Sequence, residues 1–218
     1  LTIDTDGSLD ASPGDYTFAG TISSGVGSSV TARVTKTGAG SQTFTGNNTY
    51  DLNTDITGGV LYVEGSHTNS TAGRGYAISG GQLGGSGSIT LSNGDIVLTG
   101  AGGLTPGSSV GVLTLSLGTG DLNLSGIAGG GNGNLLWELG SIVASDRIDL
   151  LTGDLLIGSD LLRFSDFNFQ TAAGWGSPGD YTLINSNASI VGSVDASNAS
   201  GTIGGLNATL FISADGQD

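Results

Sequence analysis

The chain lacks several residue types on which common protein classes depend. It has no cysteine, only 3 prolines, a single histidine and 5 lysines and arginines among 218 residues. The absence of cysteine excludes disulfide bonds and cysteine–zinc sites, so stability must come from burial and backbone hydrogen bonding. The sequence also lacks an apolar run of about 18 residues, and it therefore predicts no membrane-spanning helix.

Positive charge is scarce as well. The chain carries 19 acidic residues against 5 basic ones, a formal net charge of −14. This balance excludes nucleic-acid binding through a basic face, and it disfavours contact with anionic membrane surfaces. An acidic surface of this kind favours solubility and attracts cations.

Glycine is abundant, with 42 residues, yet 36% of the chain is hydrophobic, so it is not a disordered linker. The glycines punctuate a repeat. The phrase NGDIVLTG at residues 93–100 recurs as TGDLNLSG at 119–126 and more loosely as TGDLLIG at 152–158. Each copy is a turn followed by a short apolar–polar alternation, and repetition on this scale is typical of stacked architectures.

The local pattern favours strands throughout, because glycine and β-branched residues interrupt every helical periodicity. Leu113, Leu115 and Leu117 alternate with Thr114 and Ser116, as in a half-buried strand. The predicted strands cover residues 17–22, 29–36, 59–64, 87–91, 95–99, 111–117, 121–124, 135–139, 147–151, 154–157, 161–164, 181–185, 190–194 and 208–213.

Five phrases in the middle of the chain support a family resemblance. They are VTKTGAGSQTFTGNNTY (34–50), GGVLYVEG (58–65), GGQLGGSGSI (80–89), LTPGSSVGVL (104–113) and SDRID (145–149). Their order resembles the autotransporter-associated β-strand repeat of bacterial secreted and surface proteins, over about residues 30 to 160. The C-terminal part resembles surface proteins that end in a Pro-Glu-Pro sorting tail, although these 218 residues contain no such tail. The resemblance implies an exported, structural or adhesive right-handed parallel β-helix.

We therefore predict an all-β, right-handed parallel β-helix with an aromatic-rich C-terminal capping segment. With ~20 residues per coil and a strand spacing of ~4.8 Å, we expect roughly ten coils, with glycine at corners that need positive φ. Residues 1–160 are expected to form the coils, residues 129–133 a wide turn, and residues 161–218 a cap continuous with them. The cap is marked by five aromatic residues: Phe164, Phe167, Phe169, Trp175 and Tyr181.

The two ends of the chain contain matching phrases. Residues 12–18 (SPGDYTF) resemble 177–183 (SPGDYTL), and residues 1–7 resemble 210–216. One interpretation is a Pro-Gly-Asp turn used twice to begin a strand. The other is that the ends are equivalent elements at a subunit junction, since an open solenoid has an edge at each end. On that reading the assembly residues are Leu1, Ile3, Leu210 and Ile212, with residues 210–213 of one subunit meeting residues 1–4 of the next.

Catalytic chemistry is not indicated, and we predict no catalytic residue and no enzyme. The basic residues Arg33, Lys36, Arg74, Arg147 and Arg163 are scattered, whereas polysaccharide cleavage by a β-helix needs basic residues clustered with aspartates. Arg147 is expected to form a structural ion pair with Asp146 or Asp149. His67 lies in a polar segment and is expected to be a solvated loop residue. The close pairs Asp4/Asp6 and Asp51/Asp55 are expected to cap turns or simply to be solvated.

Two kinds of modification or ligand remain as hypotheses. The calcium-binding nonapeptide of β-helices is absent, because Ile89 stands where that pattern needs aspartate, but Ca²⁺ could still bind oxygen ligands from Asp4, Asp6 and Asp10. Asn-x-Ser/Thr sequons, which chance alone can produce in such a composition, mark candidate glycosylation sites at Asn47, Asn69, Asn123, Asn187, Asn198 and Asn207. No cofactor is predicted.

The first functional hypothesis is an extracellular or cell-surface structural protein, a homo-oligomer that associates end to end into a filament or matrix. The alternatives are an adhesive module that binds a surface polysaccharide and, third, a polysaccharide-degrading β-helix. All three imply a secreted or surface location. Because the chain opens at Leu1, we expect that a signal peptide has been removed or that the chain is a fragment of a longer precursor.

Overall fold

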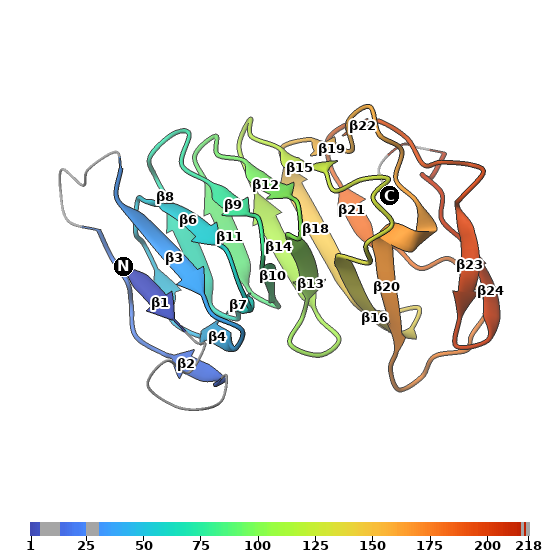
Figure 1. Cartoon of the computed structure of the whole chain (residues 1–218), viewed down its shortest axis with the longest axis horizontal. Helices are drawn as coiled ribbons and strands as arrows, with labels where there is room; N and C mark the ends of the chain where they lie inside the picture. The colour runs from blue at the N-terminus through green and yellow to red at the C-terminus, as the bar shows by residue number, and fades with distance from the viewer. Residues whose placement is uncertain (5–13, 25–30, 215, 217–218) are drawn as a thin grey trace.

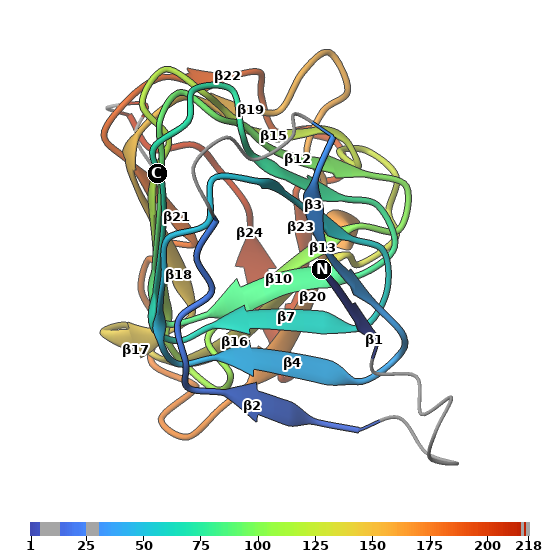
Figure 2. The ribbon, with the colours of Figure 1, turned by 90° about the vertical axis from the view of Figure 1, so that its left-hand side faces the viewer.

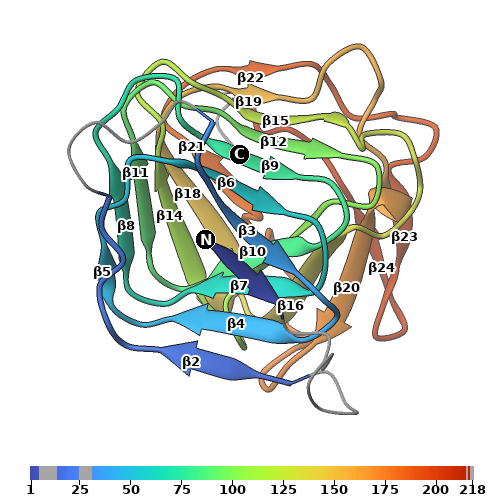
Figure 3. The ribbon, with the colours of Figure 1, turned by 60° about the vertical axis from the view of Figure 1, so that its left-hand side comes forward.

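The computed structural model describes residues 1–4, 14–24, 31–214 and 216, and it is a parallel β-helix (Figure 1). Three parallel sheets, here called A, B and C, form its faces and enclose one interior (Figure 3). Viewed from the N-terminal end, the chain runs clockwise from sheet A to B to C while receding from the viewer, so the solenoid is right-handed (Figure 2). The predicted fold class is confirmed.

Each sheet is built from one short strand per coil. Sheet A runs β1 (Thr2–Asp4), β3 (Arg33–Thr37), β6 (Asn53–Ile56), β9 (Tyr76–Ile78), β12 (Ile96–Thr99), β15 (Leu122–Gly126), β19 (Leu155–Leu156) and β22 (Ile190–Val191). Sheet B runs β2 (Tyr16–Phe18), β4 (Ser41–Phe44), β7 (Val60–Val63), β10 (Gln82–Gly85), β13 (Gly103–Pro106), β16 (Leu135–Ser141) and β20 (Phe167–Thr171), and β17 (Ala144–Ser145) folds back on β16. Sheet C runs β5 (Asn47–Asn48), β8 (Ser66–Asn69), β11 (Ser88–Leu91), β14 (Val112–Ser116), β18 (Arg147–Thr152) and β21 (Ile184–Ser186).

The coils are fewer and longer than expected. Among the described residues, sheet A has 8 strands rather than roughly ten. Equivalent positions lie 20 residues apart at Val34 and Thr54, but 33 residues apart at Thr2 and Thr35 and 35 residues apart at Leu155 and Ile190. The segments that connect the strands are therefore longer in the first coil and in the last coils. The wide turn expected at residues 129–133 lies in one of these longer loops, between β15 and β16.

The interior is filled by columns of aligned side chains, one from each coil. In sheet A the inward residues Tyr76, Ile96 and Leu122 occupy paired positions on successive strands, and each is at most 2% exposed. Leu113, Leu115 and Leu117 are fully buried as their alternation predicted. Burying a side chain of this kind stabilises the fold by about 1.5–3 kcal/mol, so the columns are the main source of stability.

Two glycine columns mark the corners, and they work differently. Gly38 and Gly59 have φ of 74° and 61° at the corner between sheets A and B, as expected for positive-φ glycines. Gly46, Gly65 and Gly87, between sheets B and C, have no such φ. A Cβ at Gly65 or Gly87 would instead clash with the carbonyl oxygen of the glycine one coil earlier. This second column therefore needs glycine for close backbone approach.

The C-terminal end differs from the coils. The strand expected at 161–164 is reduced to one parallel β-bridge between Leu162 and Val194, and Phe164 begins the short 3₁₀ turn η1 (Phe164–Asp166). An antiparallel hairpin, β23 (Ser200–Ile203) and β24 (Leu206–Thr209), lies beyond the last coil (Figure 1). The predicted strand at 208–213 is wrong beyond Thr209, because residues 210–213 have no strand pairing.

Candidate functional sites at the two ends of the solenoid

At each end of the solenoid the sheets finish in strands that pair on one side only. Among the described residues, β1 and β2 pair on one side only, with β3 and β4. The strands β20, β21 and β22 likewise pair only with the preceding coil. Unpaired strand edges are templates for the addition of another strand. Among the described residues, the outer edges of β20, β21 and β22 therefore have no strand partner, and the hairpin β23–β24 lies beyond them. Sheets A and B also end in unpaired edges at the N-terminal end.

The N-terminal edge exposes large apolar side chains. Leu1 is 64% exposed, Tyr16 46% and Phe18 40%. The Phe18 ring is packed edge-on against Phe44 of the next coil at 6.3 Å between centroids. Ile3 is partly buried against the core and sits in register with Lys36. An aqueous surface would not normally cluster such residues, so this edge is a candidate contact surface.

The predicted assembly residues at the other end lie differently. Leu210 and Ile212 are partly buried and pack against the core, while Phe211 between them is 55% exposed. The matching terminal phrases are not equivalent elements. Tyr16–Phe18 forms the strand β2 of sheet B, whereas Tyr181 and Leu183 precede β21 of sheet C. The described part of residues 12–18 begins at Gly14.

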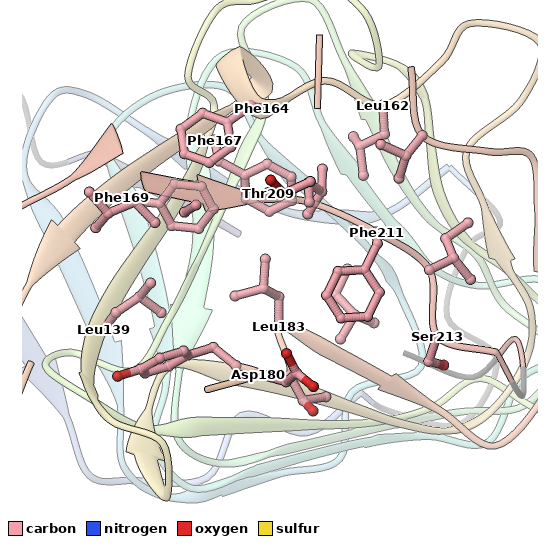
Figure 4. Close-up of a pocket in the computed structure, with 18 of the residues that line it drawn as sticks. Leu139, Leu162, Phe164, Phe167, Phe169, Asp180, Leu183, Thr209, Phe211 and Ser213 are labelled. Atoms are coloured by element: carbon pink, nitrogen blue, oxygen red, sulfur yellow. The ribbon is translucent and has the colours of Figure 1, made fainter. Parts of the chain in front are cut away.

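A cavity of about 520 Å³ lies between the last coil and the C-terminal hairpin (Figure 4). Phe164, Phe167 and Phe169 line it from η1 and β20, with the last two rings stacked at 5.1 Å. The segment 177–184 and residues 206–213 also line it, as do apolar residues of the last coils such as Leu139, Leu155 and Leu162. Protein interiors rarely leave voids much larger than a water molecule, so a cavity of this size is a candidate binding site.

The hairpin approaches the aromatic residues through its glycines. A Cβ at Gly201 would clash with the ring of Phe164, and a Cβ at Gly204 would lie 2.6 Å from Trp175 Nε1. The Leu210 N–H donates to the Ala199 carbonyl at 2.8 Å, and the Phe164 N–H donates to the Asn198 carbonyl at 2.9 Å. These contacts hold the hairpin over the end of the interior.

The prediction for His67 is wrong. His67 lies on β8 with its side chain in the interior, and it is only 1% exposed. Its ring stacks on Tyr50 at 3.9 Å between centroids. Nε2 lies 3.0 Å from the Tyr50 backbone oxygen, which can only accept, so Nε2 carries the proton and Nδ1 accepts from the Tyr76 hydroxyl at 2.6 Å. Burial lowers the pKa of His67, against the opposing effects of the Tyr50 carbonyl and the Asp51 charge.

The acidic and basic residues form structural contacts. The expected Arg147 ion pair forms with Asp149, at 2.7 Å from Nε to Oδ1. Asp146 is instead 1% exposed and accepts from the N–H groups of Gly111 and Glu138 at 2.9 and 2.7 Å. Burial raises the pKa of Asp146 to about 6, partly offset by those two hydrogen bonds.

Asp51 and Asp55 are capping and pairing residues. Asp51 accepts from the backbone N–H groups of Ser70 and Thr71 at 2.6 and 3.3 Å, as a turn-capping carboxylate should. Asp55 instead pairs with Arg33 at 2.9 Å.

The aspartates of the repeated phrase form a column along sheet A. Asp95, Asp121 and Asp154 immediately precede paired strand positions on successive coils. The Asp95 carboxylate accepts the N–H of Asp121 at 2.9 Å, and that of Asp154 accepts the N–H of Ser189 at 3.1 Å. Partial burial raises the pKa of Asp121, and the charges of Asp95 and Asp154 add to the effect. The turn of each repeat thus fastens the next coil.

The calcium candidates give no defined geometry. Asp6 and Asp10 lie outside the described residues, and Asp4 is described only through its backbone pairing with Thr37. Across residues 14–24 and 31–214, no group of three or more histidine, cysteine, aspartate or glutamate residues could hold a metal ion.

The sequons differ in accessibility. Asn69 is 1% exposed and donates to the Leu52 carbonyl at 3.0 Å, so it is closed to modification in the folded chain. Asn123 is half-buried and accepts from Ser125 of its own sequon at 2.6 Å. The remaining candidates are exposed: Asn47, Asn187, Asn198 and Asn207.

Comparison with known proteins gives one partial match. The chain is 40% identical over 92 residues to the Adhesin BmaC autotransporter of Brucella suis biovar 1 (strain 1330), which covers 42% of this chain but only 2% of that protein. The resemblance to autotransporter proteins is supported at this level. No family model matches the sequence, and no solved structure matches it. In the described part of the chain, no helix has the length and apolar character needed to cross a membrane.

Proposed function

We propose that this chain is a structural or adhesive segment of a bacterial surface or secreted protein, and that it associates end to end rather than catalysing a reaction. The partial match to an autotransporter adhesin supports the surface role. The observation that carries the proposal is the pair of strand edges at opposite ends of one solenoid. Sheets A and B begin with β1 and β2 and end with β22 and β20, each paired on one side among the described residues.

The two ends of the solenoid carry strand edges that could pair with each other. Each coil adds its strand parallel to that of the coil before, and among the described strands of the three sheets only β17 runs antiparallel. A second copy placed head to tail would therefore continue sheets A and B across the junction once the hairpin β23–β24 has moved away from the end of the last coil. The exposed side chains of Tyr16 and Phe18 would be covered there. Strand addition satisfies backbone groups that water otherwise solvates. Contact between unlike ends repeats indefinitely, which gives a filament unless the chain of contacts closes into a ring.

This geometry moves the proposed junction away from residues 210–213. Leu210 and Ile212 pack inward, so β20, β21 and β22 offer the strand edges instead. The net charge of −14 opposes association, and added salt screens that repulsion.

The test is sedimentation velocity of the full chain over a range of protein and salt concentrations. We expect the sedimentation coefficient to rise with both. The carbonyl of Phe18 in β2 accepts from the N–H of Thr45, directly after β4, at 3.0 Å, so the N–H of the neighbouring Thr17 points to the free edge. Thr17→Pro removes that donor and should keep the chain monomeric, since proline is tolerated only where the ladder does not need the N–H.

Thr17→Val is the matched control, because it keeps the backbone donor and should associate like the natural chain. A chain that stays monomeric at high salt and high concentration contradicts end-to-end association, as does unimpaired assembly of Thr17→Pro. Monomeric protein that binds immobilised surface polysaccharide would favour the adhesive alternative. Turnover of a polysaccharide would contradict the non-catalytic role.

A further inference from the structure

The cavity at the C-terminal end is built like a small-molecule site rather than a packing defect. Its volume of about 520 Å³ lies within the roughly 300–1,000 Å³ of ordinary ligand pockets. Figure 4 shows Leu139, Leu162 and the aromatic side chains of η1 and β20 around a common space, with Leu183 and Phe211 facing it. These side chains come from elements far apart in sequence, and each contributes apolar surface.

The polar groups of the cavity are few and lie where solvent reaches it. Ser177, Asp180, Asn207 and Thr209 line the cavity and are exposed, which places its mouth between residues 177–182 and 207–213. Asp180 supplies a carboxylate at this mouth. None of the chain's 5 basic residues is among the described residues that line the cavity.

This charge distribution selects the class of ligand. A carboxylate, sulfate or phosphate group at the mouth would face Asp180 with no cation to neutralise it, within a molecule of net charge −14. Like charges repel even where water screens them, and no cation among the described residues that line the cavity offsets the repulsion. An uncharged or cationic ligand avoids that cost and still buries its apolar surface against the phenylalanine rings.

We propose that the C-terminal cavity binds one uncharged or cationic apolar small molecule, held between the phenylalanine side chains of the last coil and the C-terminal hairpin. Trp175 lines the cavity, whereas Trp137, the only other tryptophan, does not. Binding of a suitable fluorophore should quench tryptophan emission by energy transfer, from Trp175 in the wall and from Trp137, whose ring centroid lies 5.6 Å from that of Phe167.

The experiment uses two dyes that share one ring system. N-phenyl-1-naphthylamine is uncharged, and 8-anilinonaphthalene-1-sulfonate adds a sulfonate to the same ring system. We expect the uncharged dye to bind the full chain saturably at one site, and the sulfonate to bind several-fold more weakly. Dodecyltrimethylammonium below its micelle concentration should displace the uncharged dye, and dodecanoate should not. Asp180→Asn should reduce the difference in affinity between the two dyes, because it removes the negative charge that repels the sulfonate.

Two variants locate the site. Leu183→Trp fills the cavity and should reduce dye affinity at least ten-fold, whereas Leu151→Trp, at an exposed position outside the cavity, should leave it unchanged. Circular dichroism checks that each variant is folded, and Ala208→Phe fills the cavity from the hairpin if Leu183→Trp does not fold. No saturable binding, equal affinity for both dyes, or undiminished binding to a folded filled-cavity variant would each overturn the proposal.

Discussion

The Nδ1 atom of His67 lies 2.6 Å from the hydroxyl oxygen of Tyr76, on the strand of the next coil, inside the solenoid. The hydroxyl donates, because Nε2 holds the ring proton against the Tyr50 carbonyl at 3.0 Å. The neutral ring therefore accepts from the buried Tyr76 hydroxyl and donates to the buried Tyr50 carbonyl. This one imidazole thus links a residue 17 positions before it in the chain to one 9 positions after it.

The first prediction concerns acid sensitivity. Burial lowers the pKa of His67 below its usual 6.5, so the folded state keeps the ring neutral while the unfolded chain takes up a proton. The stability that His67 contributes is present above pH 6.5 and is lost as pH falls below it toward the lowered pKa. Asp51 is the nearby charge that opposes the shift. Urea unfolding of the natural chain and of His67→Gln should differ in pH dependence across that window, and parallel curves would contradict the assignment.

The second prediction concerns the cost of removing the imidazole at neutral pH. His67→Leu leaves the Tyr50 carbonyl and the Tyr76 hydroxyl without their partner, and each such buried group costs about 1–3 kcal/mol. The free energy of unfolding should fall accordingly. A matched apolar change at Ile89, the next position in the same column, to leucine should cost less than about 1.5 kcal/mol.

The third prediction gives Asp146 the opposite pH dependence. Its carboxyl has a pKa of about 6 in the fold against 3.8 normally, so the folded state favours the protonated form. This contribution is present below pH 3.8 and is lost as pH rises through 6. The difference in unfolding free energy between the natural chain and Asp146→Asn should therefore move in favour of the natural chain on acidification from pH 7 to pH 4. A difference that is constant with pH would show that the carboxyl titrates normally.

The fourth prediction tests the glycine column between sheets B and C. A Cβ at Gly65 would lie under 3.0 Å from three backbone atoms of the preceding coil, so Gly65→Ala should destabilise the chain by about 1–3 kcal/mol. At Gly73, with φ of 72°, a Cβ meets nothing within 4 Å, and Gly73→Asn should be tolerated because asparagine accepts that conformation. Thermal unfolding followed by circular dichroism compares the two. Equal losses of stability in the two variants would mean that close approach of the backbones does not explain the need for glycine at position 65.

The fifth prediction tests how the hairpin is attached. Gly201→Val puts a side chain where the Phe164 ring lies, so the hairpin should detach while the coils remain folded. Limited proteolysis should then cleave after the last coil, and far-ultraviolet circular dichroism should change little. Gly205→Asn, in open space with φ of 82°, should keep the natural cleavage pattern. Protection of the hairpin in Gly201→Val would exclude this mode of attachment.

Fold class followed from sequence because glycine turns and short alternations recur in every part of the chain. Individual strands were less predictable. β5 is Asn47–Asn48 and β10 contains Gly84 and Gly85, residues that disfavour isolated strands. In a solenoid the neighbouring coils supply the ladder hydrogen bonds and the burial, so position overrides propensity.

The interior role of His67 could not be inferred from its neighbours in sequence. Ser66, Thr68 and Asn69 are polar, and Tyr50 and Tyr76 reach the ring only through stacking of the coils. One signal was available: Ser66 and Thr68 alternate with His67 and Asn69, as β8 alternates between outward and inward positions. At the C-terminus, Leu210 and Ile212 read as strand residues but turn inward, because the end of the interior is where unpaired apolar side chains find cover.

The glycine column and the aspartate column restrict how such a chain can change in length. Gly65 and Gly87 must stay superposed, and so must Asp95 and Asp121, or the contacts between one turn and the next are lost. An insertion that keeps the interior intact must therefore add a whole number of coils. The loops outside the sheets are not held to this alignment. The interval between equivalent residues can therefore widen from 20 to 35 residues while the strands remain paired. Loop length can therefore vary freely, whereas the stack of strands can change only by whole coils.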